Sequence, residues 1–276
     1  MIILANRIRW VTLHGIVFIG ICLILVLKAN AQNIAPKVLE VYPTTDSIPV
    51  NILRFYIQFS APMQEMNILK HIKLSNEDGK NITGVFFENQ YELWNDDRTK
   101  VTLIIDPGRV KLGLFANNTM GRAFDEGKKY TLTIDSLLMD FNDQKLSGKF
   151  SKTFLAVKED RVPPDTENWK LLLPKANSSD AILINFQDKI DHVSAHTLIK
   201  VFQNNKEIQG QISLSNQEQN WAFKPFKNWE KGNYSIIINP RLEDIVANSL
   251  NQIFDHNPSV FTPNNSANVY IKFTIK

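Results

Sequence analysis

Cysteine is almost absent from this chain. Of 276 residues only Cys22 carries a thiol, and it lies in an apolar run near the N-terminus. It follows FIGI, which is not the Leu-small-small pattern of a lipoprotein signal. If the N-terminal segment is removed, no thiol remains, so disulfides, thiolate metal sites and cysteine nucleophiles are excluded together. We therefore expect a protein held together by its apolar core.

The chain also lacks runs of Lys or Arg. Its formal net charge is +3, but the first 31 residues hold three of the 31 basic residues and none of the 28 acidic ones. The remainder therefore has 28 basic and 28 acidic residues. Nucleic-acid binding needs concentrated positive charge to displace counterions, so we expect no nucleic-acid partner.

The N-terminal segment has the order of a secretory signal. Two arginines come first, an apolar run follows over residues 11–27, and residues 29–31 read ANA. We predict a signal peptide over residues 1–31, cleaved before Gln32, and an exported protein: periplasmic, surface-bound or secreted. The run is longer than the roughly 7–15 residues of a signal core, so a retained membrane anchor is the competing interpretation. After cleavage we expect no integral membrane span.

Alternation of apolar and polar residues is common, and helical periodicity is scarce. Residues 53–60 (LRFYIQFS), 129–134 (KYTLTI) and 268–275 (NVYIKFTI) alternate with a period of two. This pattern predicts strands with one face buried and the other wet. Short strands separated by Asn, Asp, Gly and Pro clusters predict an all-β chain folded as a sandwich or barrel.

The two halves of the chain contain similar segments in the same order. LRFYIQFSAPM (53–63) resembles ILINFQDKID (182–191), residues 127–146 resemble 232–250, and KFSKTFLAV (149–157) is echoed by the C-terminal strand. Each half has the size of a sandwich domain. The segment between them, KEDRVPPDTEN, is charged and carries two prolines that stiffen it. We predict domain 1 over residues 34–157, a linker over 158–168 and domain 2 over 169–276.

Tyr130 and Tyr234 each follow a Gly closely and begin a strand late in their half. This placement is typical of the tyrosine corner of immunoglobulin-like (Ig-like) sandwiches, in which the phenol bonds back to the preceding loop. An ordinary aromatic residue in a strand is the alternative for either tyrosine alone. Recurrence in both halves favours the corner.

Four segments give the chain a resemblance to a known family. FSAPM after an alternating strand, the ELW…DPGR segment, GKKYTLTI and RLEDIVANSL resemble bacterial Ig-like domains of the SbsA, S-layer type. The second half is more degenerate, because FQDKID replaces FSAPM. The resemblance implies two tandem Ig-like β-sandwich domains and an envelope or secreted location. It implies no reaction, cofactor or catalytic residue.

The most chemically suggestive stretch is residues 93–109, LWNDDRTKVTLIIDPGR. Asp96, Asp97 and Arg98 suit a hairpin turn, because Asn and Asp side chains bond the backbone two residues on. Pro107-Gly108 suits a type II turn with positive φ at the Gly, and Asp106 is placed to pair with Arg109 across it. Adjacent turn carboxylates lack the fixed gap of a hydrolytic pair. We interpret the stretch as a hairpin.

The other conspicuous polar groups also lack the pattern of a catalytic or metal site. Asp140, Asn142 and Asp143 offer calcium ligands but lack the spacing of a defined calcium loop. His192 and His196 have the i, i+4 separation of zinc-binding helices, without the following Glu or an evident third ligand. We predict a solvated helical turn there. Ser60 has no nucleophile-elbow context and is interpreted as the polar end of a strand. We therefore predict no catalytic, cofactor-binding or metal-binding residue.

Trp94, Trp169, Trp221 and Trp229 stand at strand positions, where aromatic residues are more often core than sugar-stacking platforms. Our leading hypothesis is a non-enzymatic exported Ig-like protein, a structural or interaction module of the cell envelope with a protein or glycan partner. The alternative is a glycan-binding accessory module that uses Trp94 or Trp229. A metal-dependent hydrolase at His192 and His196 is a third, weaker possibility.

Overall fold

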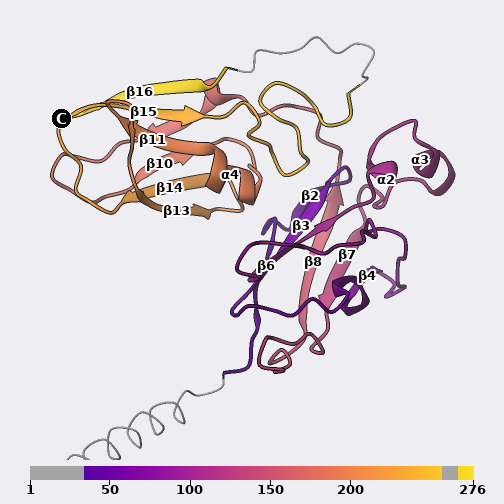
Figure 1. The fold of residues 1–276 in the computed structure, drawn as a ribbon. Helices are drawn as coiled ribbons and strands as arrows, with labels where there is room; N and C mark the ends of the chain where they lie inside the picture. The colour runs from indigo at the N-terminus through magenta and orange to yellow at the C-terminus, as the bar shows by residue number, and fades with distance from the viewer. Residues whose placement is uncertain (1–33, 257–266) are drawn as a thin grey trace, which may run out of the picture. The chain divides into compact units, whose positions relative to one another are not determined.

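The computed structural model describes residues 34–256 and 267–276, of which 36–276 form one compact unit. The predicted signal peptide and its cleavage position lie outside the described residues. No helix within the described ranges is long and apolar enough to cross a membrane. Strands dominate, and Figure 1 shows them in two groups along the chain.

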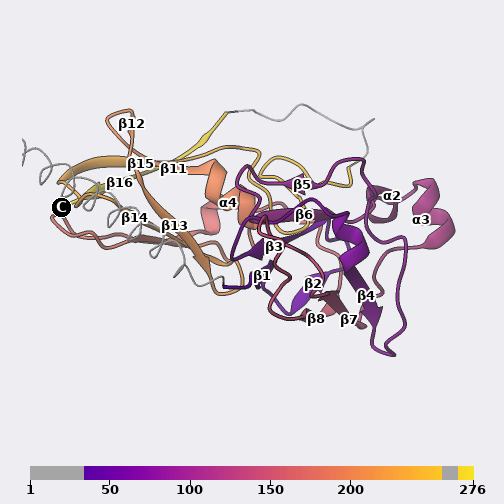
Figure 2. The same ribbon diagram turned by 60° about the horizontal axis from the view of Figure 1, so that its bottom comes forward.

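The first group forms two four-stranded sheets, ordered β1-β3-β6-β5 and β2-β8-β7-β4. The strands are β1 Val38–Tyr42, β2 Ser47–Pro49, β3 Arg54–Phe59, β4 Ile72–Asn76, β5 Leu93–Trp94, β6 Lys100–Ile104, β7 Lys129–Ile134 and β8 Phe150–Val157, with helices η1 Ile68–His71, α2 Pro107–Val110 and α3 Phe115–Met120 between them. Neighbouring strands are antiparallel except β2 and β8, which are parallel. Figure 2 shows the two layers, with β3, β5 and β6 in one and β2, β7 and β8 in the other.

The second group repeats the arrangement, with sheets ordered β13-β14-β10-β9 and β12-β11-β15-β16. Its strands are β9 Lys170–Leu172, β10 Ile182–Asn185, β11 Ile199–Gln203, β12 Lys206–Glu207, β13 Gly210–Ser215, β14 Asn220–Pro225, β15 Gly232–Ile238 and β16 Val269–Ile275, with helices η2 Thr166–Asn168 and α4 His192–Leu198. Its paired strands are all antiparallel.

Both strand orders are those of an Ig-like sandwich, in which strands A, B, E and D form one sheet and C, F and G the other. In the first sandwich β1-β3-β6-β5 corresponds to A-B-E-D and β4, β7 and β8 to C, F and G. In the second, β9-β10-β14-β13 and β11, β15 and β16 take these places. The predicted all-β class with tandem Ig-like sandwiches is confirmed.

The predicted alternation places apolar side chains in two separate cores. In β7, Tyr130, Leu132 and Ile134 are buried while the intervening threonines are half-buried. In β16, Phe273 and Ile275 are buried, and they lie opposite Tyr234 and Gly232 of β15. Burial of apolar surface at roughly 25 cal/mol per Å² is the main stabilising term in a chain with no disulfide.

The repeated sequence segments lie on equivalent strands of the two sandwiches. LRFYIQFSAPM and ILINFQDKID contain β3 and β10, both B strands, and the second repeated pair contains β7 and β15, both F strands. The third pair contains β8 and β16, both G strands. Equivalent positions in the sheets thus explain why these segments resemble each other. The domain boundaries at 157/158 and 168/169 stay predictions.

Both predicted tyrosine corners are confirmed. The Tyr130 hydroxyl accepts a hydrogen bond from the Asp125 backbone N–H at 2.8 Å. The Tyr234 hydroxyl accepts from the Glu230 N–H at 3.2 Å and donates to the Glu230 carbonyl at 3.0 Å. Each phenol is buried at the start of the F strand and ties down the loop that precedes it.

Candidate functional site

Residues 93–104 form the predicted hairpin. Leu93 and Trp94 of β5 pair antiparallel with β6. In the turn, Asn95 Oδ1 accepts from the Lys100 N–H at 2.8 Å, and Asp97 Oδ1 accepts from the Thr99 N–H at 3.1 Å. The Thr99 hydroxyl and N–H lower the pKa of Asp97. Asn95 and Asp97 therefore stabilise the turn.

The prediction for Pro107-Gly108 was wrong in its turn type. Residues 107–110 form the short helix α2, so Gly108 does not have the positive φ of a type II turn. Asp106 is the N-cap, and its Oδ1 accepts from the Gly108 N–H at 2.8 Å. Arg109 is buried, and its guanidinium donates to backbone carbonyls 84, 121 and 122 instead of pairing with Asp106. It holds two irregular segments together.

The Asp140 carboxylate, one of the suggested calcium ligands, holds the turn between β7 and β8. Its Oδ1 accepts from the Asn142 N–H at 2.8 Å and the Gln144 N–H at 2.9 Å. Gln64 donates to the Asp143 carboxylate at 2.8 Å. Asp140 is 4% exposed, so its burial is explained by backbone hydrogen bonds.

The same turn occurs in the second sandwich. Asp244 Oδ1 accepts from the Val246 N–H at 2.9 Å and the Asn248 N–H at 2.8 Å. The Asn248 amide also donates to Asp244 Oδ2 at 2.8 Å. Burial of this carboxylate, 1% exposed, raises the pKa of Asp244 to about 8, and the nearby charges of Asp188 and Asp160 add to the rise. The sequence reading did not single out Asp244.

His192 and His196 lie on α4, so the predicted helical turn is present, but both side chains are half-buried and not fully solvated. The His192 ring stacks on Tyr42, with centroids 3.6 Å apart, and lies 4.5 Å from the His196 ring. Burial, together with the nearby charges of His196 and Lys100, lowers the pKa of His192 to about 3. The helix N-cap, Asp191, accepts from the Ser194 N–H. The His192 ring therefore packs against both Tyr42 and the His196 ring.

No three His, Cys, Asp or Glu side chains within residues 34–256 and 267–276 gather into a group that could hold a metal ion. Ser60 follows β3, and its hydroxyl accepts from the Lys37 N–H at 3.0 Å. It therefore connects the ends of two strands, as expected for the polar end of β3.

Of the four tryptophans, only Trp94 and Trp221 lie in strands, and Trp169, Trp221 and Trp229 belong to the second core. Trp221, Trp229 and Trp169 are 0%, 2% and 7% exposed. The Trp229 indole donates to the Asp180 carbonyl at 2.7 Å, so it is not an open stacking platform. Trp94 is half-buried against the first core, and its indole donates to Glu92 at 2.6 Å. Trp229 is therefore not accessible as the sugar-stacking surface that the glycan-binding alternative requires.

The sequence reading missed a polar contact on the outer face of β3. Arg54 and Tyr56 were expected to face solvent, yet Tyr56 is 4% exposed. Its hydroxyl donates to Asp191 Oδ2 at 2.8 Å, and Arg54 forms an ion pair with Glu243. Both acids come from the second sandwich. Asp191, 3% exposed, thus caps α4 and binds Tyr56 at the same time.

A second contact involves the β13–β14 turn. Glu218 Oε1 accepts from the Thr44 N–H at 2.8 Å, and the Thr45 hydroxyl donates to Gln217 at 3.1 Å. The Glu218 carboxylate is buried, and burial raises its pKa. Lys152 donates to the Thr44 carbonyl at 2.9 Å from the same side. No local sequence pattern signals this contact, because its members are far apart in the chain.

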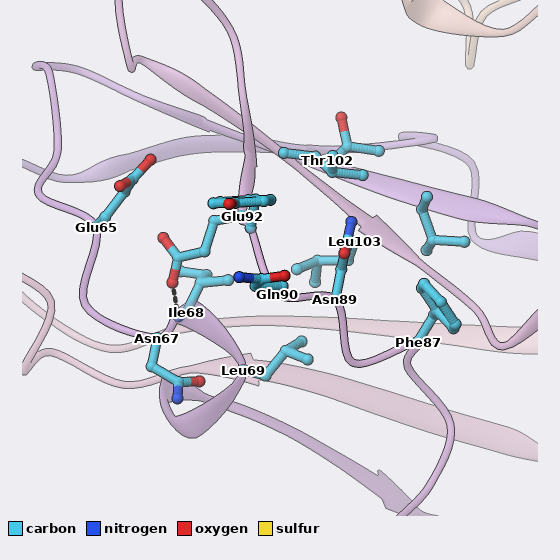
Figure 3. A pocket seen from close by; sticks show the side chains of 13 residues that line it. Glu65, Asn67, Ile68, Leu69, Phe87, Asn89, Gln90, Glu92, Thr102 and Leu103 are labelled. Carbon is cyan, nitrogen blue, oxygen red and sulfur yellow. Dashed lines mark hydrogen bonds between the residues drawn. The ribbon is translucent and has the colours of Figure 1, made fainter.

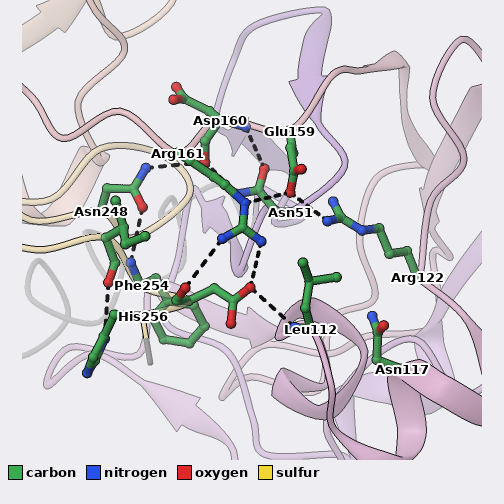
Figure 4. A network of polar contacts seen from close by, with 12 residues as sticks. Asn51, Leu112, Asn117, Arg122, Glu159, Asp160, Arg161, Asn248, Phe254 and His256 are labelled. Atoms are coloured by element: carbon green, nitrogen blue, oxygen red, sulfur yellow. Dashed lines mark hydrogen bonds and ion pairs between the residues drawn. The ribbon is translucent and has the colours of Figure 1, made fainter. Parts of the chain in front are cut away.

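The segment that follows β8 is ordered by a third polar network, drawn in Figure 4. Asn51 and Asp160 exchange two hydrogen bonds, of 2.6 and 2.9 Å, in which the Asn51 side chain binds the Asp160 backbone. Arg161 lies at the centre and pairs with Glu159 at 3.0 Å and Asp255 at 2.7 Å. This is a charged segment held to its neighbours at several points.

A pocket of about 270 Å³ opens on the first sandwich (Figure 3). Its walls come from η1, from the irregular segment 87–92 with the adjoining β5, and from β6. Phe87 and Tyr91 are exposed beside it, and Asn89 and Gln90 line it. The sequence predicts a strand end from Tyr91 to Trp94, of which only Leu93 and Trp94 form a strand, and it assigns no role to residues 87–90.

Comparison with known proteins adds little. No protein-family model matches the sequence, and no curated protein sequence matches it. Solved structures that resemble the chain include native alpha-2-macroglobulin from Escherichia coli (TM-score 0.29, 10% identity, 77% of this chain and 68% of that one). Another is the S-layer protein SbsC (TM-score 0.31, 11% identity, 88% of this chain and 41% of that one). The titin domains Z1Z2 match with a TM-score of 0.22 and 12% identity, over 88% of this chain and 95% of that one.

The assignment of the fold rests on the strand orders themselves. Both sandwiches have A-B-E-D and C-F-G sheets with a tyrosine corner at the start of strand F. The chain therefore consists of Ig-like sandwiches.

Proposed function

We propose that this chain is an exported, non-enzymatic Ig-like protein that acts as a structural or interaction module of a bacterial cell envelope. The chain would be related to Ig-like domains of the SbsA, S-layer type. Its partner would be a protein or glycan of the envelope. The N-terminal segment with its ANA sequence supports export.

The observation that carries this proposal is the use of the conspicuous polar residues as scaffold. Asp106 and Asp191 cap helices, and Asp140 and Asp244 hold the turns between strands F and G. Catalytic groups need a free, positioned functional atom facing a substrate. A carboxylate occupied by backbone N–H groups does not meet that requirement.

The contacts of β3 support a mechanical role. Tyr56 and Arg54 are bound to Asp191 and Glu243, and the charged segment after β8 is tied by Arg161. Hydrogen bonds to charged groups contribute about 1.5–3 kcal/mol each when buried. We therefore expect the described sandwiches to unfold as one unit, as suits a module that bears load or presents a fixed surface.

Export is tested by expressing the full chain with a C-terminal tag in a bacterial host and sequencing the N-terminus of the protein in each cell fraction. We expect a mature protein that begins at Gln32 in the periplasm, envelope or medium. A matched variant with Ala29→Glu and Ala31→Glu should retain residues 1–31, because small residues are needed at the cleavage site. Unprocessed native protein in the cytoplasm would contradict the proposal.

The non-enzymatic role is tested with the purified protein and chromogenic ester, glycoside, phosphoester and peptide substrates. We expect hydrolysis at the buffer rate. Excess zinc or calcium should leave the melting temperature unchanged, since a metal bound only by the folded state would raise it. Turnover that disappears in His192→Ala or His196→Ala would favour the hydrolase alternative.

A further inference from the structure

The pocket on the first sandwich is lined by three elements: η1, the segment 87–92 with β5, and β6. Along β6, Val101 and Leu103 are buried, whereas Thr102 and Ile104 are half-buried and line the pocket, with Ile104 also packed against the core. Figure 3 shows Asn89 and Gln90 between β6 on one side and the η1 segment on the other. The three elements therefore enclose a space that faces solvent.

Glu92 holds these walls together. One carboxylate oxygen accepts from the Ile68 N–H at the start of η1, and the other accepts from the Trp94 indole at 2.6 Å. At the far end, the Phe87 N–H donates to the Ile104 carbonyl at 2.8 Å. Each Glu92 oxygen thus accepts one hydrogen bond from the protein, so Glu92 positions the walls of the pocket.

The groups left free are amides and aromatic rings. In the described part of the chain, the side chains of Asn89 and Gln90 have no hydrogen-bond partner. Tyr91 is 71% exposed and Phe87 is 48% exposed. A primary amide offers two donors and one acceptor, which match neighbouring hydroxyl groups, while an exposed ring offers an apolar face.

Charge and size restrict the ligand. No lysine, arginine or histidine is among the residues that line the pocket, while Glu65 and Glu92 are. An anionic ligand is therefore disfavoured. A volume of about 270 Å³ lies just below the roughly 300–1,000 Å³ of small-molecule pockets. An adjoining hollow of about 270 Å³ shares Asn67, Leu69 and Asn89 with it, which allows a ligand of more than one ring. Its other two lining residues, Lys70 and Glu88, carry opposite charges, so the hollow adds no net charge.

A peptide that adds a strand fits this edge poorly. Such binding uses a row of backbone groups along a sheet edge. Strand β5, at the edge of the sheet, contains only Leu93 and Trp94. The edge therefore offers few backbone partners, while the side chains beside it are those that suit hydroxyl-rich rings.

The geometry points to a binding site for a neutral oligosaccharide in this pocket, with Tyr91 and Phe87 as stacking surfaces and Asn89 and Gln90 as hydroxyl partners. The inference rests on the proposed function and deepens it, because it names a neutral glycan as the partner and places its binding site. It also differs from the sequence-based alternative, which relied on Trp94 and Trp229.

The test uses the processed protein and a glycan array of neutral oligosaccharides, with acidic polysaccharides and extended peptides included. Binders are then titrated in solution while tryptophan fluorescence is followed, because Trp94 is linked to the pocket through Glu92. We expect neutral oligosaccharides to bind, with about tenfold weaker binding in Tyr91→Ala and in Asn89→Ala, the change that 1.4 kcal/mol produces.

The matched control is Tyr270→Ala, which removes a tyrosine that is 56% exposed on the second sandwich. Its affinity should equal that of the native protein. Binding that survives Tyr91→Ala, preference for acidic polysaccharides or peptides, or an array with no neutral binder would each overturn the inference. None of these results bears on export or on the absence of turnover.

Discussion

The two sandwiches share their corners and differ in their connections. Between strands E and F the first sandwich inserts residues 105–128, with α2 and α3, whereas the second uses only residues 226–231. Before strand D, the first has the irregular segment 77–92, whereas the second has the short strand β12. The tyrosine corner and the aspartate-held turn between F and G occur in both.

This difference separates what the fold requires from what it tolerates. The corner and the turn hold the F strand in place, so both sandwiches keep them. The insertions of the first sandwich add Val85, Val110 and Phe124 to its core. They also carry several exposed apolar side chains, among them Phe87, Tyr91 and Phe115. Loops on a rigid scaffold are where binding residues concentrate. We therefore look for specific binding on the first sandwich.

Loss of a core aromatic residue should have the largest effect. Trp221→Ala in the second sandwich and Phe154→Ala in the first should each lower the free energy of unfolding by about 3–5 kcal/mol, because each leaves a cavity. In calorimetry both should shift one shared transition, since β3 couples the sandwiches. Phe226→Ala, at a side chain 74% exposed, is the control and should change stability by less than about 0.5 kcal/mol. Two transitions that move separately would contradict the coupling.

The stability of the second sandwich should depend on pH through Asp244. The folded pKa of Asp244, about 8, is above its ordinary value of 3.8, so the folded state favours the protonated acid. Its stabilising contribution is complete below about pH 4 and is lost as the pH rises toward 8, by at most about 1.4 kcal/mol per pH unit. Asp244→Asn should remove this slope in urea unfolding measured from pH 4 to 8. An unchanged slope in the variant would show that another group is responsible.

The contact between Tyr56 and Asp191 should have an intermediate effect. Tyr56→Phe removes a buried hydrogen bond to a carboxylate and should lower the free energy of unfolding by about 1.5–3 kcal/mol. A double-mutant cycle with Asp191→Asn separates this bond from the helix cap that Asp191 also provides. Tyr270→Phe serves as the exposed control. A coupling energy near zero would mean that the contact adds nothing to stability.

Loss of a tyrosine-corner hydroxyl should have the smallest effect on stability, and the effect should differ between the two corners. Tyr234→Phe removes two hydrogen bonds to the Glu230 backbone, whereas Tyr130→Phe removes one to Asp125. At about 1 kcal/mol per bond, the Tyr234 variant should lose more stability in urea unfolding. Equal losses, or the reverse order, would argue against the difference between the corners.

Local patterns predicted the parts of the fold that depend on local burial. Alternation in residues 129–134 identified β7, because a strand with one buried face needs no information from elsewhere. The corners followed from the position of Tyr130 and Tyr234 in the repeat. Asp97 was assigned to its turn because the bond it makes lies within two residues.

The failures arose where the decisive partner is distant or where two structures share one signature. Tyr56 was assigned to solvent because Asp191 lies 135 positions further along the chain. His192 was expected to be solvated because Tyr42, which covers it, is also remote. Asp106-Pro107-Gly108 suits both a type II turn and a helix start, since Asp caps helices and Pro favours their first position.

Amide hydrogen exchange in Asp244→Ala and Asp140→Ala variants addresses most directly whether these buried acids serve as backbone supports. Exchange should accelerate locally at Val246 and Asn248 in the first variant and at Asn142 and Gln144 in the second, because each loses its carboxylate acceptor. Unchanged protection at these amides would contradict the assignment and return both carboxylates to the list of groups available for chemistry.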